Sequence, residues 1–433
     1  MLYHPPRISK DLANGSFTAR NPFHKYLPYC PEIGGVPVAG LVEQFGSPLF
    51  VYDERKLRKQ AARYRKAFGG YPLRPSWSVK TNYLTAICKL YFAMGWGAEV
   101  VSEFELDKML WAGVAGKDIT LNGPCWSRDA LLKALRLGAT IHLDNLDELT
   151  TVERLVAEHK LQGTVGIRCW MKNPHLAGPA WNKFGLALDT GEAARAALRV
   201  IHNSRLTLDV LHNHCGTQVR EPQAYTYTAR KLVELQTLLY EQTEYLVPAL
   251  NLGGGFPSAA LLHNEPDGTK RPTIEEYAKA ITSVLNKLPP KERPTLRLET
   301  GRHLVDEAGS LVTSVAAVKN GMVIIDSGIH HLYTAQFHRL DVLPTWQCAA
   351  SEAYPTRLAG NLCMNIDIIR DEVLLPPLEP GRLLVVRPAG AYNITQSMQF
   401  ISLRPAVVIV TQDGAVRLIR RRELLADVQG LEA

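Results

Sequence analysis

The chain has 433 residues, with 49 Lys and Arg against 42 Asp and Glu, so its formal net charge is +7. Its 46% apolar and 21% charged residues are the ordinary mix of a folded protein and exclude global disorder, and no apolar run approaches the roughly 20 residues that span a bilayer. Residues 1–20 lack the apolar core of a secretory signal, and seven irregularly spaced cysteines suit a reducing compartment. We therefore expect a cytoplasmic protein without membrane or nucleic-acid partners, and its length suggests two domains.

Residues 1–46 show no helical periodicity, and we assign them to the domain that the last part of the chain forms. From about residue 50 to residue 305, short runs of β-branched or aromatic residues alternate with polar turns and helical patterns. The runs are Pro75–Val79, Ala98–Val101, Ile119–Leu121, Thr140–Leu143, Val165–Cys169, Leu208–Leu211, Leu250–Leu252 and Leu296–Leu298. An extra helix, at about Asp53–Phe68, precedes the first run.

Helix-boundary signals lie between these runs. Ser102 and Glu105 have the spacing of a capping box, and Gly138 lies where a helix should end. Strands that alternate with helices are parallel, and eight such units in about 250 residues match a closed (β/α)8 barrel better than an open sheet. The sequence therefore predicts an α/β protein with a TIM barrel over residues 47–305.

Beyond residue 305 the pattern changes to short alternating runs separated by Gly, Pro and Asp. The clearest are Leu311–Val318, Met322–Ile325, Arg382–Val386 and Ala406–Thr411. This pattern is typical of antiparallel β structure. We therefore predict that residues 306–433 form a second, antiparallel β domain.

Functional side chains of a TIM barrel gather where strands end and loops begin. The first run ends in Lys80, the sixth in His212-Asn213-His214-Cys215-Gly216-Thr217, the seventh in Gly253-Gly254-Gly255 and the eighth in Glu299-Thr300-Gly301-Arg302. Alone, such a Lys is usually a solvated surface residue, and three glycines can be an ordinary loop. Together they supply an amine, backbone N–H groups that can approach a phosphate, an aromatic base and a carboxylate. This set indicates pyridoxal 5′-phosphate (PLP), which needs a Schiff-base Lys, phosphate donors and an acid at its ring nitrogen.

We expect no metal centre. His212 and His214 are the closest pair of possible ligands, but we expect them to face opposite sides of their strand. No cysteine or carboxylate spacing completes a ligand set around them.

With these residues the chain resembles the fold-type III PLP-dependent amino-acid decarboxylases, most of all the diaminopimelate decarboxylases and their relatives. The shared segments run over almost the whole chain, from Phe50-Val51-Tyr52-Asp53 to Ile419-Arg420-Arg421-Arg422-Glu423. Between them, besides the strand-end segments, lie Ser78-Val79-Lys80-Thr81-Asn82, Lys183-Phe184-Gly185, Asp326-Ser327-Gly328, Gly360-Asn361-Leu362-Cys363 and Gly390-Ala391-Tyr392.

The resemblance implies a role for each matching residue. Lys80 would carry PLP as a Schiff base, His214 would stack on its ring, and Glu299 would pair with the ring nitrogen. The phosphate would be held by Thr217, Gly253, Gly254, Gly255, Gly301 and Arg302, and Tyr392 would contact the cofactor or the substrate.

The resemblance also implies an assembly. Cys363 would donate a proton to the α-carbon after CO₂ leaves, reaching the site from the partner subunit of a homodimer with shared active sites. The second domain would be an antiparallel β-barrel built from both chain ends.

The departures from the family pattern concern the substrate. Met364 follows Cys363 where the family usually has an acidic residue that binds a distal amine, and Ile329-His330-His331-Leu332-Tyr333 replaces a segment whose Arg binds a distal carboxylate. The Gly-x-His-His pattern is similar to that of relatives acting on conjugated amino acids in antibiotic or siderophore pathways. Thr300 replaces a Pro, a change that we expect to be tolerated. We expect substrate contacts from Arg302, His331, Tyr333, Met364 and Tyr392.

We predict a PLP-dependent α-decarboxylase (a carboxy-lyase) of an amino acid or amino-acid conjugate, in siderophore or other secondary-metabolite biosynthesis. A PLP-dependent racemase is one alternative, although a racemase of this fold has Arg in place of Glu299 and Tyr in place of Cys363. A non-catalytic PLP-binding homologue is another, although it would be expected to lack Lys80, Glu299 or Cys363.

Overall fold

The computed structural model describes residues 26–176 and 182–432, which fold as two compact units. The barrel unit contains residues 58–258 and 271–305, within the described part of the chain. The sheet unit contains the described residues up to 57, residues 259–270 and the chain from residue 306 onward.

Eight parallel strands form the barrel, as the sequence predicts. They pair in the order β4-β5-β6-β7-β8-β10-β11-β13, and β13 pairs with β4, so this sheet closes on itself. The strands are β4 (Leu73–Ser78), β5 (Gly97–Val100), β6 (Ile119–Leu121), β7 (Thr140–Leu143), β8 (Gly163–Trp170), β10 (Leu206–His212), β11 (Ala249–Asn251) and β13 (Thr295–Thr300). A short strand, β9 (Leu186–Ala187), extends β8 at its end.

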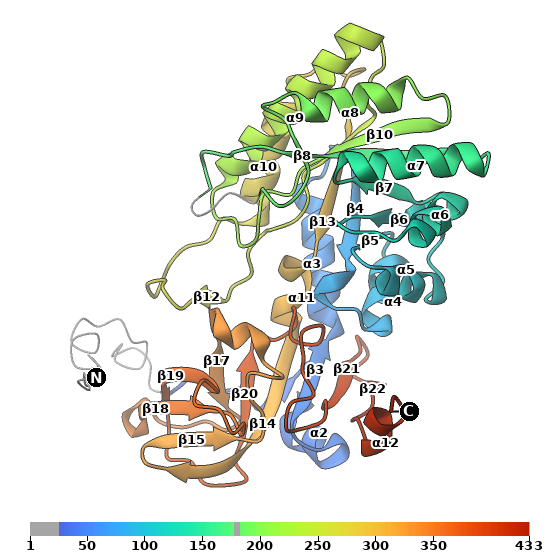
Figure 1. Cartoon of the computed structure of the whole chain (residues 1–433). Coiled ribbons are helices and arrows are strands. Elements are labelled where there is room, and N and C mark those ends of the chain that lie inside the picture. Colours follow the sequence, from blue (N-terminus) through green and yellow to red (C-terminus); the bar gives the residue numbers. More distant parts are fainter. Residues whose placement is uncertain (1–25, 177–181, 433) are drawn as a thin grey trace, which may run out of the picture. The chain divides into compact units, whose positions relative to one another are not determined.

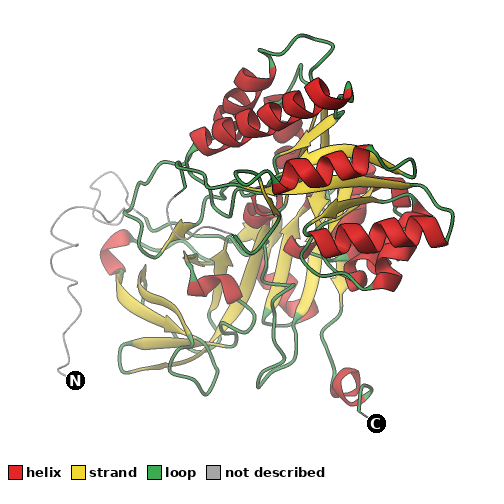
Figure 2. Ribbon diagram, turned by 45° about the horizontal axis from the view of Figure 1, so that its top comes forward, coloured by secondary structure: helices red, strands yellow, loops and turns green. Residues whose placement is uncertain are grey.

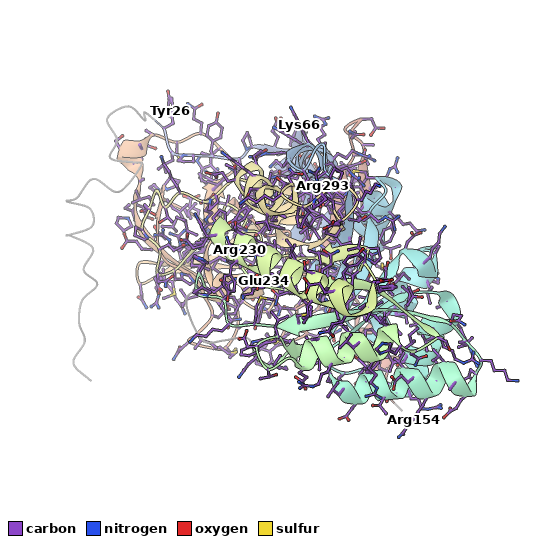
Figure 3. All side chains as sticks on the ribbon, turned by 90° about the horizontal axis from the view of Figure 1, so that it is seen from above. Tyr26, Lys66, Arg154, Arg230, Glu234 and Arg293 are labelled. Atoms are coloured by element: carbon purple, nitrogen blue, oxygen red, sulfur yellow. The ribbon has the colours of Figure 1, made fainter. Side chains whose placement is uncertain are left out.

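Helices cover the outside of this barrel (Figure 2). They are α4 (Thr85–Ala93), α5 (Glu103–Trp111), α6 (Arg128–Leu137), α7 (Leu146–Glu158), α8 (Glu192–Ile201), α9 (Pro222–Thr243) and α10 (Ile274–Leu285). The short α11 (Arg302–Val305) follows the last barrel strand, and the extra helix α3 (Glu54–Ala67) precedes the first. Figure 3 shows Arg154 on α7, and Arg230 and Glu234 on α9, on exposed faces of these helices.

The expected helix boundaries are present. The Ser102 hydroxyl accepts the backbone N–H of Glu105 at 3.2 Å, capping α5. Gly138 ends α6 with φ 68°, a left-handed conformation that glycine adopts without steric cost. Local signals therefore fix where these helices begin and end.

The sheet unit is built around one long strand, β14 (Gly309–Lys319), which is visible in Figure 1 beside β3 (Leu49–Asp53). The other strands are β1 (Glu32–Ile33), β2 (Val36–Pro37), β12 (Leu261–Leu262), β15 (Met322–Ile325), β16 (His338–Arg339), β17 (Asp341–Pro344), β18 (Tyr354–Ala359), β19 (Ile368–Leu375), β20 (Leu383–Arg387), β21 (Ala406–Val410) and β22 (Val416–Arg420). Two small helices, α2 (Val38–Phe45) and α12 (Leu425–Gln429), accompany them. The pairing branches at β14 and is mostly antiparallel, but β15–β18 and β3–β21 are parallel.

Both ends of the described chain contribute to the core of the sheet unit. Ile33 and Leu41 pack in one buried apolar cluster with Val312, Val385 and Val408. β3 falls inside the range 47–305 that the sequence assigned to the barrel, but it pairs with β14 and β21 of the sheet unit. Its five residues are all buried, as expected for a strand enclosed on both faces.

Among the helices of residues 26–176 and 182–432, none is both long and apolar enough to cross a bilayer. All seven cysteines lie in these ranges, and none of them forms a disulfide.

Candidate active site

Polar side chains line the inside of the barrel near the carboxyl ends of its strands. Each of the eight strands contributes one, within the strand or directly after it, and all eight are buried. This polar layer consists of Ser78, Glu99, Asn122, His142, Arg168, His212, Asn251 and Glu299. Buried polar groups must find partners inside the protein, and most of these side chains hydrogen-bond one another.

Lys80 lies at the edge of the polar layer, on a single 3₁₀ turn (Val79–Thr81) that follows β4. Its Nζ donates to both carboxylate oxygens of Glu99, at 2.7 and 3.0 Å. The Glu99 side chain has no exposed surface, whereas that of Lys80 is 39% exposed. Ser78 also donates to Glu99, at 2.5 Å. The site thus contains a partly accessible amine held at a fixed position by a buried carboxylate.

Glu299 lies in the same layer and is held by two amides. Asn251 Nδ2 donates to its Oε1 at 2.7 Å, and Asn122 Nδ2 donates to its Oε2 at 3.0 Å. His142 Nδ1 lies 3.6 Å from Oε1, and His212 Nε2 lies 3.3 Å from Oε2. Thr300, the next residue, is buried and donates its hydroxyl to Tyr64 Oη at 2.5 Å, which explains how a polar residue is accommodated there.

His214 follows β10 and is held by the glycine segment. Its Nδ1 accepts the backbone N–H of Gly254 at 3.1 Å. Burial lowers the pKa of His214 to about 3, so the ring is neutral at physiological pH. A neutral, fixed imidazole can cover the face of a flat ligand without adding charge.

We expected His212 and His214 to face opposite sides of one strand, and the reason for this expectation was wrong. Residues two apart on a strand share a face. The two differ because β10 ends at His212, so His214 belongs to the following loop. His212 instead lies against His142 and Glu299, and one nitrogen or oxygen of each of these three residues lies within 4.8 Å of the others.

The glycine segments have the close packing that a phosphate cradle needs. A Cβ on Gly254 would lie 2.1 Å from the carbonyl oxygen of Glu299, and one on Gly301 would lie 1.9 Å from Thr81 Oγ1. Gly253 also has φ +66°, which a side chain would strain. Thr81 Oγ1 is buried without a hydrogen-bond partner among the described residues. Only glycine fits at these positions, and without side chains the backbone of these segments can lie close to a ligand.

These features fit PLP. Lys80 offers the amine for a covalent link, Glu299 the carboxylate for the ring nitrogen and His214 a flat neutral ring. For the phosphate, the candidate donors are the exposed Thr217, the half-buried Arg302 and the backbone N–H groups of Gly255 and Gly301, whereas those of Gly253 and Gly254 already donate to Asn251 Oδ1 and His214 Nδ1.

The remaining predicted residues lie in the sheet unit. Cys363 and Met364 are exposed, and Tyr392 has a left-handed backbone with φ +62°, a conformation that is uncommon outside glycine and often marks a functional site. Tyr333 is half-buried and begins a short 3₁₀ turn. His331 is buried, with Nδ1 3.1 Å from Ser327 Oγ.

Three loops of the sheet unit, residues 327–333, 360–367 and 396–402, are tied together and are called here the loop cluster. Asp367 accepts the backbone N–H groups of Ile329 and Leu362, each at 2.8 Å. His330 Nε2 lies 2.6 Å from Ser402 Oγ. Asp367 is the single charged residue in the sequence of these loops, and it is buried. The loop that carries the exposed thiol of Cys363 therefore has no accessible charged side chain of its own; charged side chains from outside the three loops, Arg404 and Glu423, bond Ser397 and Gln399.

Sequence reasoning missed Glu99, His142 and Asn251 as site residues. Each is the one polar residue with a long side chain in a short apolar strand, which is the signal that could have found them. Arg168 and Asp144 form an ion pair at 3.1 Å, and Arg168 lies over the Phe184 ring at 4.5 Å. They join the polar layer to the loop after β8.

Comparisons with known proteins agree with this geometry. A family model described as "Pyridoxal-dependent decarboxylase, pyridoxal binding domain" matches residues 54–306. The chain is 28% identical over 439 residues to diaminopimelate decarboxylase of Bacillus subtilis. This alignment covers 96% of this chain and 97% of that protein.

Solved structures give the same result. The crystal structure of diaminopimelate decarboxylase from M. jannaschii superposes with a TM-score of 0.87 at 26% identity, covering 94% of this chain and 98% of that one. The complex of the M. jannaschii enzyme with L-lysine gives a TM-score of 0.84 at 27% identity, covering 92% and 95%.

Proposed function

Since the chain belongs to the fold-type III PLP-dependent decarboxylases, the family of the diaminopimelate and ornithine decarboxylases, we propose that its substrate is an amino acid or amino-acid conjugate without a free distal ammonium. The reaction is removal of the α-carboxylate as CO₂. The observation that carries the proposal is the presence of two carboxylates in one buried layer. Glu99 accepts hydrogen bonds from the Lys80 amine, and Glu299 accepts hydrogen bonds from the side-chain amides of Asn122 and Asn251.

Each residue has a defined task in this proposal. PLP, when bound, supplies a ring that accepts the electron pair released as CO₂ departs. Lys80 holds the cofactor and is oriented by Glu99, while Glu299 keeps a proton at the ring nitrogen. His214 covers the ring without contributing charge, and the thiol of Cys363 supplies the proton to the α-carbon.

The substrate class follows from the loop cluster. A distal ammonium needs an accessible carboxylate. The one carboxylate in the sequence of these loops, Asp367, is buried and accepts the backbone N–H groups of Ile329 and Leu362. Met364, exposed beside Cys363, offers only apolar contact. An uncharged or conjugated distal group matches this surface, as in a siderophore or other secondary-metabolite intermediate.

We further propose a homodimer in which the Cys363 loop of one subunit completes the site of the other. Met364 and Ile366 are 39% and 65% exposed, and such apolar side chains at a loop tip are suited to burial in a subunit interface. The cytoplasm, where PLP and free thiols are both available, is the compartment that we assign.

The test is a CO₂-release assay on PLP-reconstituted protein with a substrate panel. The panel contains diaminopimelate, lysine, ornithine, arginine, glutamate and citryl-linked amino acids. We expect release from a conjugated or distally uncharged member, abolished in Lys80→Ala. Lys172→Ala is the matched control, because Lys172 also follows a barrel strand but is exposed. Turnover that survives Lys80→Ala, or a covalently bound cofactor with no release from any member, contradicts the proposal.

A further inference from the structure

Two buried histidines lie against Glu299, one near each of its carboxylate oxygens. His142, on β7, and His212, at the end of β10, have no exposed surface. Their rings stack with centroids 4.5 Å apart. None of their four ring nitrogens has a partner of good hydrogen-bond geometry among the described residues, and the closest acceptor for each ring is a carboxylate oxygen of Glu299.

The contacts are divided evenly between the two oxygens of Glu299. Oε1 accepts from Asn251 at 2.7 Å and has His142 Nδ1 at 3.6 Å. Oε2 accepts from Asn122 at 3.0 Å and has His212 Nε2 at 3.3 Å. The carboxylate is therefore enclosed by four nitrogen atoms, two on each oxygen.

Both rings are neutral, because burial holds the pKa of His142 and of His212 well below the ordinary value. A neutral imidazole carries one N–H and one bare nitrogen, and the N–H is costly to bury without an acceptor. The carboxylate oxygens are the acceptors at hand. A metal ion would instead need both histidines and one carboxylate oxygen to converge, whereas each histidine here faces a different oxygen that is already bonded to an amide.

We propose that His142 and His212 are positioning residues for Glu299, each carrying its ring proton on the nitrogen nearest a carboxylate oxygen, so that an N–H dipole at 3.6 or 3.3 Å, and not a short hydrogen bond, acts on each oxygen. His142 is then the Nδ1–H tautomer and His212 the Nε2–H tautomer. The two amide hydrogen bonds and the two N–H dipoles hold the carboxylate in the place from which it would keep a proton on a ring nitrogen. This step rests on the function proposed above, but the two tautomers do not.

The position of each donor gives a specific test. The side-chain amide nitrogen of Asn lies where Nδ1 of His lies, and that of Gln lies where Nε2 lies. His142→Asn and His212→Gln therefore keep the donor, whereas the exchanged pair, His142→Gln and His212→Asn, misplaces it. His202→Asn, at the exposed end of α8, is the control substitution.

We expect the two misplaced variants to lower kcat by about tenfold or more relative to the donor-keeping variants, with KM changed little. Circular dichroism and PLP affinity of all four variants establish that they fold and load. Equal losses for Asn and Gln at each position, or losses confined to KM, would reduce the histidines to space-filling and overturn the proposal.

A second readout needs neither substrate nor cofactor. In ¹⁵N-histidine-labelled protein, the signals lost in the His142 and His212 variants should be those of neutral rings in the Nδ1–H and Nε2–H tautomers, respectively. The opposite tautomers, or a charged ring, would overturn the proposal. If these tautomers are found but no panel compound is decarboxylated, the positioning of Glu299 stands and the proposed reaction is what fails.

Discussion

The ammonium of Lys80 lies 2.7 Å from Oε1 of Glu99, and the two groups come from the ends of neighbouring barrel strands, β4 and β5. Because Glu99 is buried and Lys80 partly exposed, the carboxylate is the fixed member of this pair. It sets the position of the amine that is proposed to hold the cofactor.

Glu99→Gln should therefore change how PLP is captured. The neutral amide offers Lys80 Nζ one oxygen in place of the two that it now contacts, so the amine is held less firmly and its charge-assisted hydrogen bonds are lost. We expect the rate of covalent PLP attachment at one fixed pH to fall by about tenfold, the effect of one hydrogen bond to a charged group, measured from the absorbance of the lysine-linked cofactor in apo protein mixed with PLP. Asp107→Asn, which alters an exposed ion pair with Lys133 on the barrel surface, should leave this rate unchanged.

The sequence predicted the barrel because its signal is local. Each strand and helix is encoded in a stretch of consecutive residues, such as Thr140–Leu143, and parallel order follows from their alternation. Lys80, His214 and Glu299 could be predicted as site residues because strand ends converge in such a fold. Pairing over long sequence separations left no comparable local signal, so β3 was placed in the barrel although its partners, β14 and β21, lie in the last third of the chain.

The interior of the polar layer was harder to predict for a geometric reason. Whether His142 points into the barrel depends on which alternate residues of β7 face inward. Polar Thr140 and His142 alternate with apolar Ile141 and Leu143, but in a strand that is buried on both faces this alternation does not decide which set faces the interior. The polar partners of Glu299 also come from four separate strands or strand ends. Only the closed barrel brings Asn122, His142, His212 and Asn251 together.

Asp367→Asn should loosen the loop cluster. The carboxylate accepts two backbone N–H groups, and Asn presents only one oxygen, so one buried donor loses its partner. The expected loss is about 1–3 kcal/mol of unfolding free energy, measured by urea unfolding, with PLP capture by Lys80 unchanged. If Asp367 instead bound a substrate amine, stability would stay the same and only KM for diamino acids would rise.

His331 should make stability depend on pH. Burial lowers its pKa to about 3, against about 6.5 when unfolded, so the neutral ring stabilises the fold fully above pH 6.5 and this contribution is lost as pH falls toward 3. His331→Asn, which can still reach Ser327, removes that loss. Between pH 6.5 and pH 5.0 the variant should gain about 2 kcal/mol relative to the parent protein in urea unfolding. A parallel pH dependence of the two proteins would show that His331 is not the group that titrates.

Met364→Asp should extend the substrate range toward free diamino acids. It places a carboxylate beside Cys363 on a loop that has no other accessible charged side chain of its own. We expect kcat/KM for lysine or ornithine to rise by about tenfold, the effect of a charged hydrogen bond, while turnover of a distally uncharged substrate falls. Ile366→Asp, two residues away on the same loop and more exposed, should have no such effect. Equal gains in both variants would point to general electrostatic attraction.

Mixing two inactive variants tests the shared site. If Cys363 of one subunit serves Lys80 of the other, Lys80→Ala and Cys363→Ala are each inactive alone, but a dimer with one of each has one intact pair and one doubly altered site. Random reassociation of equal amounts makes half of the dimers mixed, so about one quarter of the parent activity should return. Sedimentation of the mixture shows that dimers re-formed. Activity that stays at the level of the separate variants, with dimers present, would place Lys80 and Cys363 of the same chain in one site.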